Sequence, residues 1–371
     1  MRAGVAAVLA LVCASQGLAQ DGPAGIVAPL VLPRFDPNAP HCAPPPGLTR
    51  SLVFLQDNER DFMQGVSAGL AMAASDRGLE YRVALAGNDA SVMLKQAKKA
   101  LDGKTGSAVV APIEPRSMAR ATLRLLWSGA YVGAIVPPPA TTILNAPQYQ
   151  TGKVLGDAAA SYIKRSLGGQ AKVVLLTHDS NQFLAPRFVA MRDALSRLPG
   201  VTVVADISPP TVDRQGGNVT MQTILLAHPA VDVVLGADTV VLGALDALRQ
   251  AGKARPNQFL GGIDGEPEAV AEIKAGGPYK ASVSLASPVF GYAMGQHAAD
   301  WLEGKTIPQA MDILPKALNA ENLAQYEADL ADPGAVYADP SRRDSYLRMY
   351  GNICYDTRDK FLNFPWSSET R

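Results

Sequence analysis

The sequence is poor in aromatic residues, in charged residues and in long apolar runs. Aromatic residues make up 6% and charged residues 18% of the 371 residues, against 47% hydrophobic residues. Lys+Arg and Asp+Glu both number 34, so there is no excess of positive charge to hold nucleic acid. After the first twenty residues, no apolar run approaches the roughly 18 residues of a membrane-spanning helix. This composition excludes a disordered chain, a collagen and a coiled coil, and the length indicates a globular protein of two domains.

Common catalytic and cofactor motifs are also missing. No G-x-G-x-x-G or Walker loop opens a helix, so we expect no nucleotide cofactor. The four histidines lack metal-ligand spacing, so we expect no metal site. The segment Gly65–Gly69 matches the G-x-S-x-G turn of serine hydrolases, which places its serine directly after a strand. Here the segment lies inside an amphipathic helical pattern, where small residues let the helix approach the sheet closely. A secreted hydrolase using Ser67 remains a rival interpretation.

The N-terminal residues 1–19 are typical of a signal peptide. Arg2 supplies the positive charge, Val5 to Ala14 the apolar segment, and Gly17-Leu18-Ala19 the small-residue cleavage site. We therefore expect export to the periplasm. Cleavage would remove Cys13 and leave Cys42 and Cys354, an even number in an oxidising compartment. The sequence predicts a disulfide between these two.

Residues 20–47 contain eight prolines and are expected to form an extended arm. From Ser51 onward, continuous apolar runs alternate with amphipathic helical patterns, which is typical of strands covered on both faces in a parallel sheet. The predicted strands are 51–56, 81–86, 107–112, 132–136, 172–177, 201–206, 231–236 and 259–263. Right-handed crossovers would place helices on both faces of each sheet, so the fold class is α/β with two doubly wound, Rossmann-like lobes in succession.

Ligands of such sheets bind beyond the carboxyl ends of the strands. The polar residues that follow predicted strands are therefore candidates for a binding site. They are Asp57, Asn58, Asn88, Asp89, His178, Asp179, Asp238 and Asp264. Asp238 has an alternative role as the cap of the helix that begins at Thr239.

The stretch from Asp238 to Gly252, followed by Phe259 to Gly265, resembles the type I periplasmic sugar-binding proteins of ribose-binding type. Members of that family have the pattern D-x-x-A-L-G-A-L-x-A-L-x-x-A-G, followed by V-G-F-D-G. Further similar segments occur in the same order, and the likeness extends from about Leu52 to Leu318. These further segments are Ala111–Ser117, Lys172–Thr177, Val212–Arg214 and Ala227–Pro229.

The resemblance implies two lobes joined by three hinge crossings, with a sugar bound between them and delivered to an ABC permease. It implies an N-terminal lobe of residues 48–147 plus 286–318, a C-terminal lobe of 148–285, and an extension over 319–371. We expect a monomer that has no enzymatic activity and does not bind nucleic acid. A sensor subunit that presents its ligand to a membrane signalling receptor is the alternative.

The resemblance also assigns roles to site residues. Asp264 matches the aspartate that binds sugar hydroxyls, Arg187 the arginine that reaches the sugar, and Phe62 an aromatic that packs on the sugar ring. Phe62 could instead be a core residue. Gln148 lies at the first expected hinge and completes the predicted set with Asp57, Asn58 and Asp238. Asp264 and Arg187 belong to no apolar stripe, so we expect both to serve binding and not the fold.

Three positions depart from the family pattern. Pro137–Pro139 replaces an Asp-Arg pair, Ala237 replaces an asparagine, and Leu285 replaces a glutamine. Fewer polar groups would leave some pentose hydroxyls unpaired, at about 1–3 kcal/mol each. Ribose itself is therefore not the expected ligand.

Overall fold

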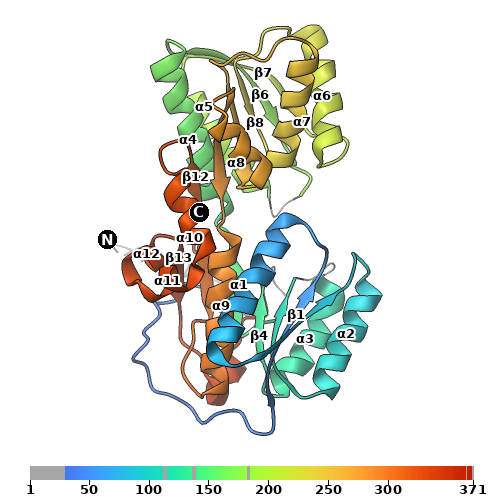
Figure 1. The fold of residues 1–371 in the computed structure, drawn as a ribbon, viewed down its shortest axis with the longest axis vertical. Helices are drawn as coiled ribbons and strands as arrows, with labels where there is room; N and C mark the ends of the chain where they lie inside the picture. Colours follow the sequence, from blue (N-terminus) through green and yellow to red (C-terminus); the bar gives the residue numbers. More distant parts are fainter. Residues whose placement is uncertain (1–29, 112–114, 136–138, 182–183, 365, 370–371) are drawn as a thin grey trace, which may run out of the picture.

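The computed structural model describes residues 30–111, 115–135, 139–181, 184–364 and 366–369. Within these ranges the chain forms two lobes, each built around one sheet (Figure 1). The expected signal peptide, Pro137 and Pro138 lie outside the described residues. None of the helices in the described ranges combines the length and apolar character that a membrane crossing requires.

The first sheet has the strand order β13-β11-β5-β4-β3-β1-β2. Its strands are β1 (Thr49–Gln56), β2 (Glu80–Leu85), β3 (Thr105–Val110), β4 (Tyr131–Ala134), β5 (Thr142–Asn145), β11 (Ala310–Ile313) and β13 (Leu347–Tyr350). All pairs are parallel except β11 with β13. Four of the predicted strands correspond to β1–β4, whereas β5, β11 and β13 were not predicted.

Helices cover both faces of the first sheet. Alternate residues of β1 point to opposite faces, with Leu52 and Phe54 in one core cluster and Val53 and Leu55 in the other. The first cluster includes residues of α1 (Asp61–Arg77) and α9 (Ser287–Leu302). The second includes residues of α2 (Ala90–Asp102) and α3 (Pro115–Trp127).

The second sheet has the order β12-β10-β9-β8-β6-β7. Its strands are β6 (Gln170–Leu176), β7 (Gly200–Ile207), β8 (Val233–Leu235), β9 (Phe259–Asp264), β10 (Tyr279–Ser284) and β12 (Lys316–Leu318). Helices α4 (Gln148–Ser166) and α5 (Ala185–Ser196) pack on one face. Helices α6 (Arg214–Ala227), α7 (Asp238–Gln250) and α8 (Pro267–Lys274) pack on the other. Only β12 is antiparallel to its neighbour. The predicted doubly wound fold is confirmed, with one antiparallel edge strand in each sheet.

The chain passes between the lobes at three places that match the expected hinge. These lie between β5 and α4, between β10 and α9, and between β11 and β12. Strand β12 lies in the second sheet, although residues 286–318 were all expected in the first lobe. The extension then forms α10 (Leu323–Ala331), α11 (Pro333–Ala338) and α12 (Pro340–Asp344) and returns to the first sheet as β13.

The described part of the arm, residues 30–47, runs along the first lobe without helix or extended strand and forms one isolated bridge, Arg34 with Tyr350. Cys42 and Cys354 are joined by a disulfide with a Cα–Cα distance of 5.9 Å, which confirms the predicted pairing. Cys354 precedes the 3-10 helix η1 (Tyr355–Lys360). The disulfide therefore ties the arm to the end of the chain.

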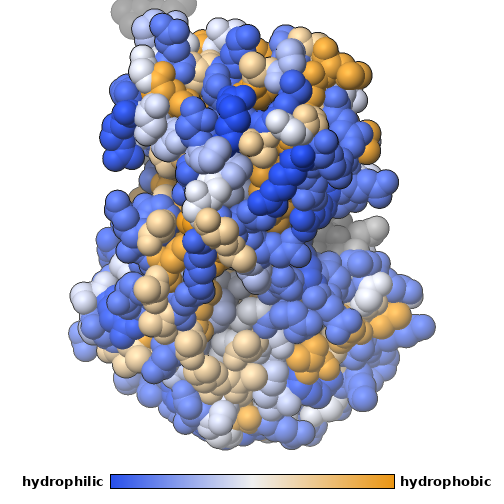
Figure 2. Space-filling model, turned by 45° about the horizontal axis from the view of Figure 1, so that its top comes forward, coloured by the Kyte–Doolittle hydropathy of each residue, from blue (hydrophilic) through white to orange (hydrophobic). Residues whose placement is uncertain are grey.

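The face of the molecule in Figure 2 carries hydrophilic residues interspersed with apolar patches over both lobes. This distribution is ordinary for a protein whose apolar strands are covered by helices, since much of a folded surface remains apolar.

Candidate functional site

Residues that follow strands of the two sheets face one another across the junction between the lobes. Asp264 ends β9 in the second lobe, and the charge of Arg60, just before α1 in the first lobe, acts to lower the pKa of its carboxyl. Arg187 of α5 acts in the same direction, while burial acts more strongly to raise this pKa. The carboxyl ends of the two sheets thus bring polar groups of both lobes together, as the strand-end rule predicts.

In the first lobe, a hydrogen-bonded turn after β1 holds Asp57 and Asn58. The Asn58 backbone N–H donates to Asp57 Oδ1 at 2.8 Å, and Asn58 Nδ2 donates to Asn88 Oδ1 at 3.1 Å. Arg60 pairs with Asp57 at 3.5 Å. Residues that follow two strands, β1 and β2, are therefore joined by hydrogen bonds into one polar edge.

Phe62 belongs partly to the core and partly to this edge. It is half-buried near the start of α1, and its ring centroid lies 5.6 Å from that of Phe290. The Arg60 guanidinium lies 5.9 Å from the centre of the Phe62 ring. Both earlier interpretations, a core residue and an apolar wall of the site, are compatible with this position.

In the second lobe, Arg187 is only 6% exposed, a burial that the sequence did not predict. Its Nε donates to Oε1 of Gln148, the first residue of α4, at 2.8 Å. Burial lowers the pKa of the guanidinium, and the nearby Asp264 opposes this. Among the described residues, no partner is found for its two terminal nitrogens. Gln148 thus holds Arg187 through its Nε atom.

Asp264 has an uncommon backbone conformation. Its φ is 123°, and the next residue, Gly265, has φ 74°. A residue other than glycine in this region carries strain, which persists where the surrounding structure or a function requires it. Within the described ranges, its carboxylate accepts no hydrogen bond. The partly exposed Asp264 carboxylate is therefore free of protein donors in the described part of the chain.

Asp238 has a different environment. It is fully buried and accepts from Tyr279 Oη at 2.7 Å, Ser282 Oγ at 2.6 Å and the backbone N–H groups of Gly265 and Glu266 at 2.8 and 2.9 Å. These four donors occupy the acceptor sites of a carboxylate. It does not cap its own helix, whose N-cap is Ala237. Asp238 thus stabilises, through hydrogen bonds, the turn that follows Asp264.

The comparison with known proteins identifies the family. The family model described as periplasmic binding protein domain matches residues 52–306. The chain belongs to this periplasmic binding protein family.

The similarity to individual curated members of the family covers only part of the chain. The ribose import binding proteins of Salmonella typhimurium and Salmonella typhi are each 35% identical over 127 residues, which is 34% of this chain and 40% of theirs. The alignment thus spans less than half the length of these curated relatives.

Solved structures share the fold at low identity. The periplasmic ribose ABC transporter protein of Conexibacter woesei has a TM-score of 0.65 and 18% identity, covering 76% of this chain and 95% of that one. The Caulobacter myo-inositol binding protein has a TM-score of 0.61 and 23% identity, covering 76% of this chain and 97% of that one.

The serine of the hydrolase-like motif lies in a helix, as the periodicity predicts. Ser67 Oγ lies 2.9 Å from Tyr81 Oη, on a helix and not on a turn after a strand. A Cβ on Gly69 would come within 2.1 Å of the backbone oxygen of Pro288. The small residues therefore let α1 approach helix α9, and not the sheet as we expected.

Two charged residues of the site were missed from the sequence. Arg60 lies three residues beyond Asp57, so the strand-end rule could have found it. Glu266 follows Asp264 by two residues, and burial together with the charges of Asp238 and Asp264 raises its pKa to about 8. Nothing in the local sequence indicates such a shift, because Asp238 is brought close only by the fold.

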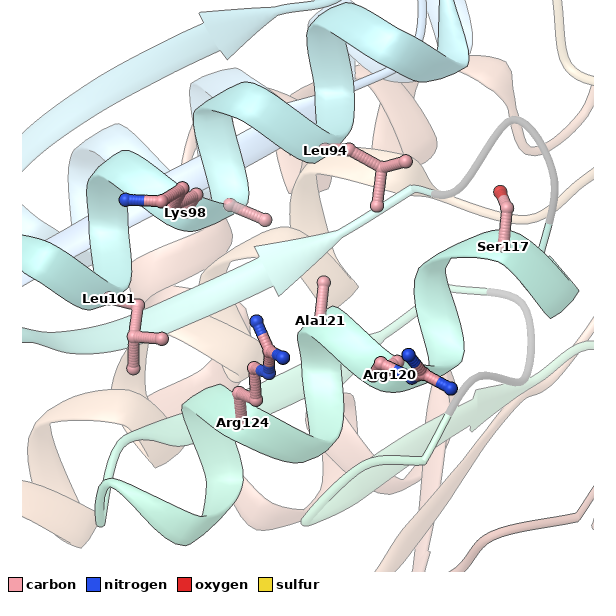
Figure 3. Close-up of a pocket in the computed structure, with 8 residues that line it drawn as sticks. Leu94, Lys98, Leu101, Ser117, Arg120, Ala121 and Arg124 are labelled. Atoms are coloured by element: carbon pink, nitrogen blue, oxygen red, sulfur yellow. The ribbon is translucent and has the colours of Figure 1, made fainter.

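A groove of about 520 Å³ lies elsewhere, between α2 and α3 on the outside of the first lobe (Figure 3). Leu94 and Leu101 contribute apolar surface, and Arg120 and Arg124 lie along α3. It contains none of the predicted site residues.

The raised pKa of Glu266 gives a pH prediction. The folded state binds the carboxyl proton of Glu266 more tightly than the unfolded chain, where the pKa is near 4.5. The contribution of Glu266 to the free energy of unfolding is therefore full at low pH and is lost as the pH rises towards about 8. We expect the unfolding free energy, measured by denaturant titration, to fall between about pH 5 and 8, and Glu266→Gln to flatten that decline. The exposed Glu321→Gln is the control and should keep the wild-type slope. An unchanged slope in Glu266→Gln would show the assignment to be wrong.

Proposed function

We propose that this protein is an exported, non-enzymatic solute-binding protein of the periplasm. It captures a small neutral polar ligand, a sugar or polyol, between its lobes and delivers it to an ABC permease. The observation that carries the proposal is that Asp264 and Arg187 lie close enough for their opposite charges to interact, while the Asp264 carboxylate and the terminal nitrogens of Arg187 lack described hydrogen-bond partners. A carboxylate accepts hydroxyl hydrogen bonds and a guanidinium donates in a fixed fork, so together they orient a polyol.

The ligand class is supported by charge as well as by the relatives. Asp264 is opposed by Arg187 and Arg60, so the site has no large excess of one charge to neutralise on a ligand. Similar proteins are named for ribose and for myo-inositol. Ala237 and Leu285 supply no side-chain hydrogen bonds, so we expect a ligand with a hydroxyl pattern other than that of ribose.

A thermal-shift screen with sugars and polyols tests the ligand class. A ligand at a hundred times its dissociation constant stabilises the folded protein by about 2.7 kcal/mol. We expect at least one sugar or polyol to raise the melting temperature, and ribose to raise it less. Stabilisation only by charged amino acids or peptides would contradict the proposed class. Cross-linking of the ligand-loaded protein in membranes tests the partner. Capture of a permease would support delivery to a transporter, and capture of a signalling receptor would support the sensor alternative.

Ligand binding is expected to close the lobes about the three crossings. The radius of gyration from solution scattering should fall when a ligand from the screen is saturating. Dilution of the ligand should restore the original radius. An unchanged radius with demonstrably bound ligand would contradict closure.

A further inference from the structure

The C-terminal extension, residues 319–369, connects the lobes a fourth time. It leaves β12 in the second sheet and enters the first sheet as β13. Figure 1 shows its helices beside the junction of the lobes. Helix α10 contacts the second lobe through Lys274 of α8, whose Nζ lies 2.5 Å from Glu327 Oε1.

The extension contacts the second crossing directly. Tyr326 of α10 is 5% exposed, and its hydroxyl is hydrogen-bonded to Ser284 Oγ. Ser284 Oγ also accepts from the backbone N–H of Ala286 at 2.9 Å, and Ala286 has φ 46°. Ser284 is the register partner of Asp264 across β9 and β10. Tyr326 therefore fixes a strained crossing beside a proposed ligand residue.

The end of the extension contacts the first and third crossings. Asp312, 2% exposed in β11, accepts from Asn145 Nδ2 at 2.7 Å, and so joins the ends of β5 and β11. Asn145 Nδ2 also lies 3.4 Å from Ser367 Oγ, which belongs to the end of the extension.

Glu369 reaches the beginning of α4. Its carboxylate accepts from the backbone N–H groups of Tyr149 and Gln150 at 3.2 and 2.7 Å. The N-cap of this helix is Pro147, which has no side-chain acceptor, so Glu369 supplies the anionic cap from the other end of the chain. The first residue of the helix is Gln148, which holds Arg187.

We propose that the extension sets the angle between the lobes in the unliganded protein, with Tyr326 and Glu369 as positioning residues for the ligand site. Neither touches the ligand. Tyr326 acts through Ser284 on the strand pair that carries Asp264, and Glu369 acts through α4 on Gln148 and Arg187. The proposal rests on the proposed function for its effect on binding, while its effect on lobe geometry requires no ligand.

The test compares Tyr326→Phe and Glu369→Gln with matched controls. Tyr292→Phe loses a hydroxyl bond to Asp76 within the first lobe, and Glu321→Gln changes an exposed residue of the extension. Spin labels on Lys95→Cys in α2 and Leu226→Cys in α6 report the interlobe distance in the full-length protein without ligand. Amide exchange reports opening of residues 145–148 and 284–287.

We expect the two hinge variants to shift or broaden the interlobe distance distribution and to speed exchange at the contacted crossing about tenfold, as loss of one hydrogen bond allows. If the wild type binds ribose or myo-inositol, titration should show that the two hinge variants bind the same sugar with a different affinity. Both controls should match the wild type in distance. Wild-type distances and exchange in both hinge variants would overturn the inference, whether or not a ligand binds. Altered distances without binding of any sugar would sustain it and contradict the proposed function.

Discussion

Asp264→Asn is expected to weaken ligand binding about ten- to hundredfold without destabilising the unliganded protein. A carboxylate that accepts from ligand hydroxyls contributes about 1.5–3 kcal/mol through charge-assisted bonds. In the unliganded state the same carboxylate is partly exposed and has no described hydrogen-bond donor, so a neutral side chain of nearly equal shape breaks no hydrogen bond there. Asparagine has the same backbone and nearly the same side-chain shape as aspartate, so the positive φ of 123° does not distinguish the two residues. Calorimetric titration and unfolding of the apo protein measure the two effects.

Asp238→Asn is the matched control for that prediction. It makes the same chemical change 26 positions along the chain, at a carboxylate that accepts from four protein donors. Here the amide nitrogen would replace either Oδ1, which accepts from Tyr279, or Oδ2, which accepts from Ser282 and two backbone N–H groups. In either case the variant loses part of this acceptor set, so we expect a loss of apo stability of about 2–3 kcal/mol. Equal stability loss in both variants, with ligand binding intact in Asp264→Asn, would show that Asp264 is structural.

Removal of the disulfide by the double substitution Cys42→Ala and Cys354→Ala is expected to lower the unfolding free energy by about 3–5 kcal/mol. The cross-link spans 312 residues, and the chain-entropy account gives the largest effects for such long loops. Calorimetry should show a lower melting temperature.

The wild-type protein, reduced while unfolded and then blocked with a thiol reagent, should unfold like the double variant. The double variant should not respond to a reductant, which separates loss of the cross-link from side effects of the alanines. If the oxidised wild type and the double variant unfold together, the disulfide does not stabilise this fold.

The sequence predicted the central strands of both sheets and missed most of those at the edge and hinge. Strands β1, β3, β4, β6, β8 and β9 are apolar runs because helices cover both faces, and that burial leaves a signal in composition. The edge strands β2 and β7 were also predicted, although most of their residues are exposed or half-buried. Strand β10 (YKASVS) carries polar residues, and β11 and β12 are four and three residues long. Their strand conformation comes from pairing with distant neighbours, which a local pattern does not contain.

The candidate site shows the same division. Asp57, Asn58 and Asp264 were found because parallel strands end at one edge of a sheet, so the position after an apolar run is informative. The burial of Arg187 was not predicted, since its cover includes Gln148, 39 positions away. Asp238 and Asp264 look alike in sequence, and only the arrival of Tyr279 and Ser282 makes one of them fully satisfied.

By itself, the sequence determined the alternation of strands and helices, the two-lobe fold and the cysteine pair, and it predicted the residues at the strand ends for which we propose ligand binding. These follow from local periodicity, residue chemistry and counting. The tertiary structure alone decided which carboxylates lack protein donors, how the lobes are connected and where Glu369 lies. Glu369 meets α4 across 219 positions and Tyr326 meets Ser284 across 42, so the identity of these partners is fixed by packing in three dimensions and by no pattern along the chain.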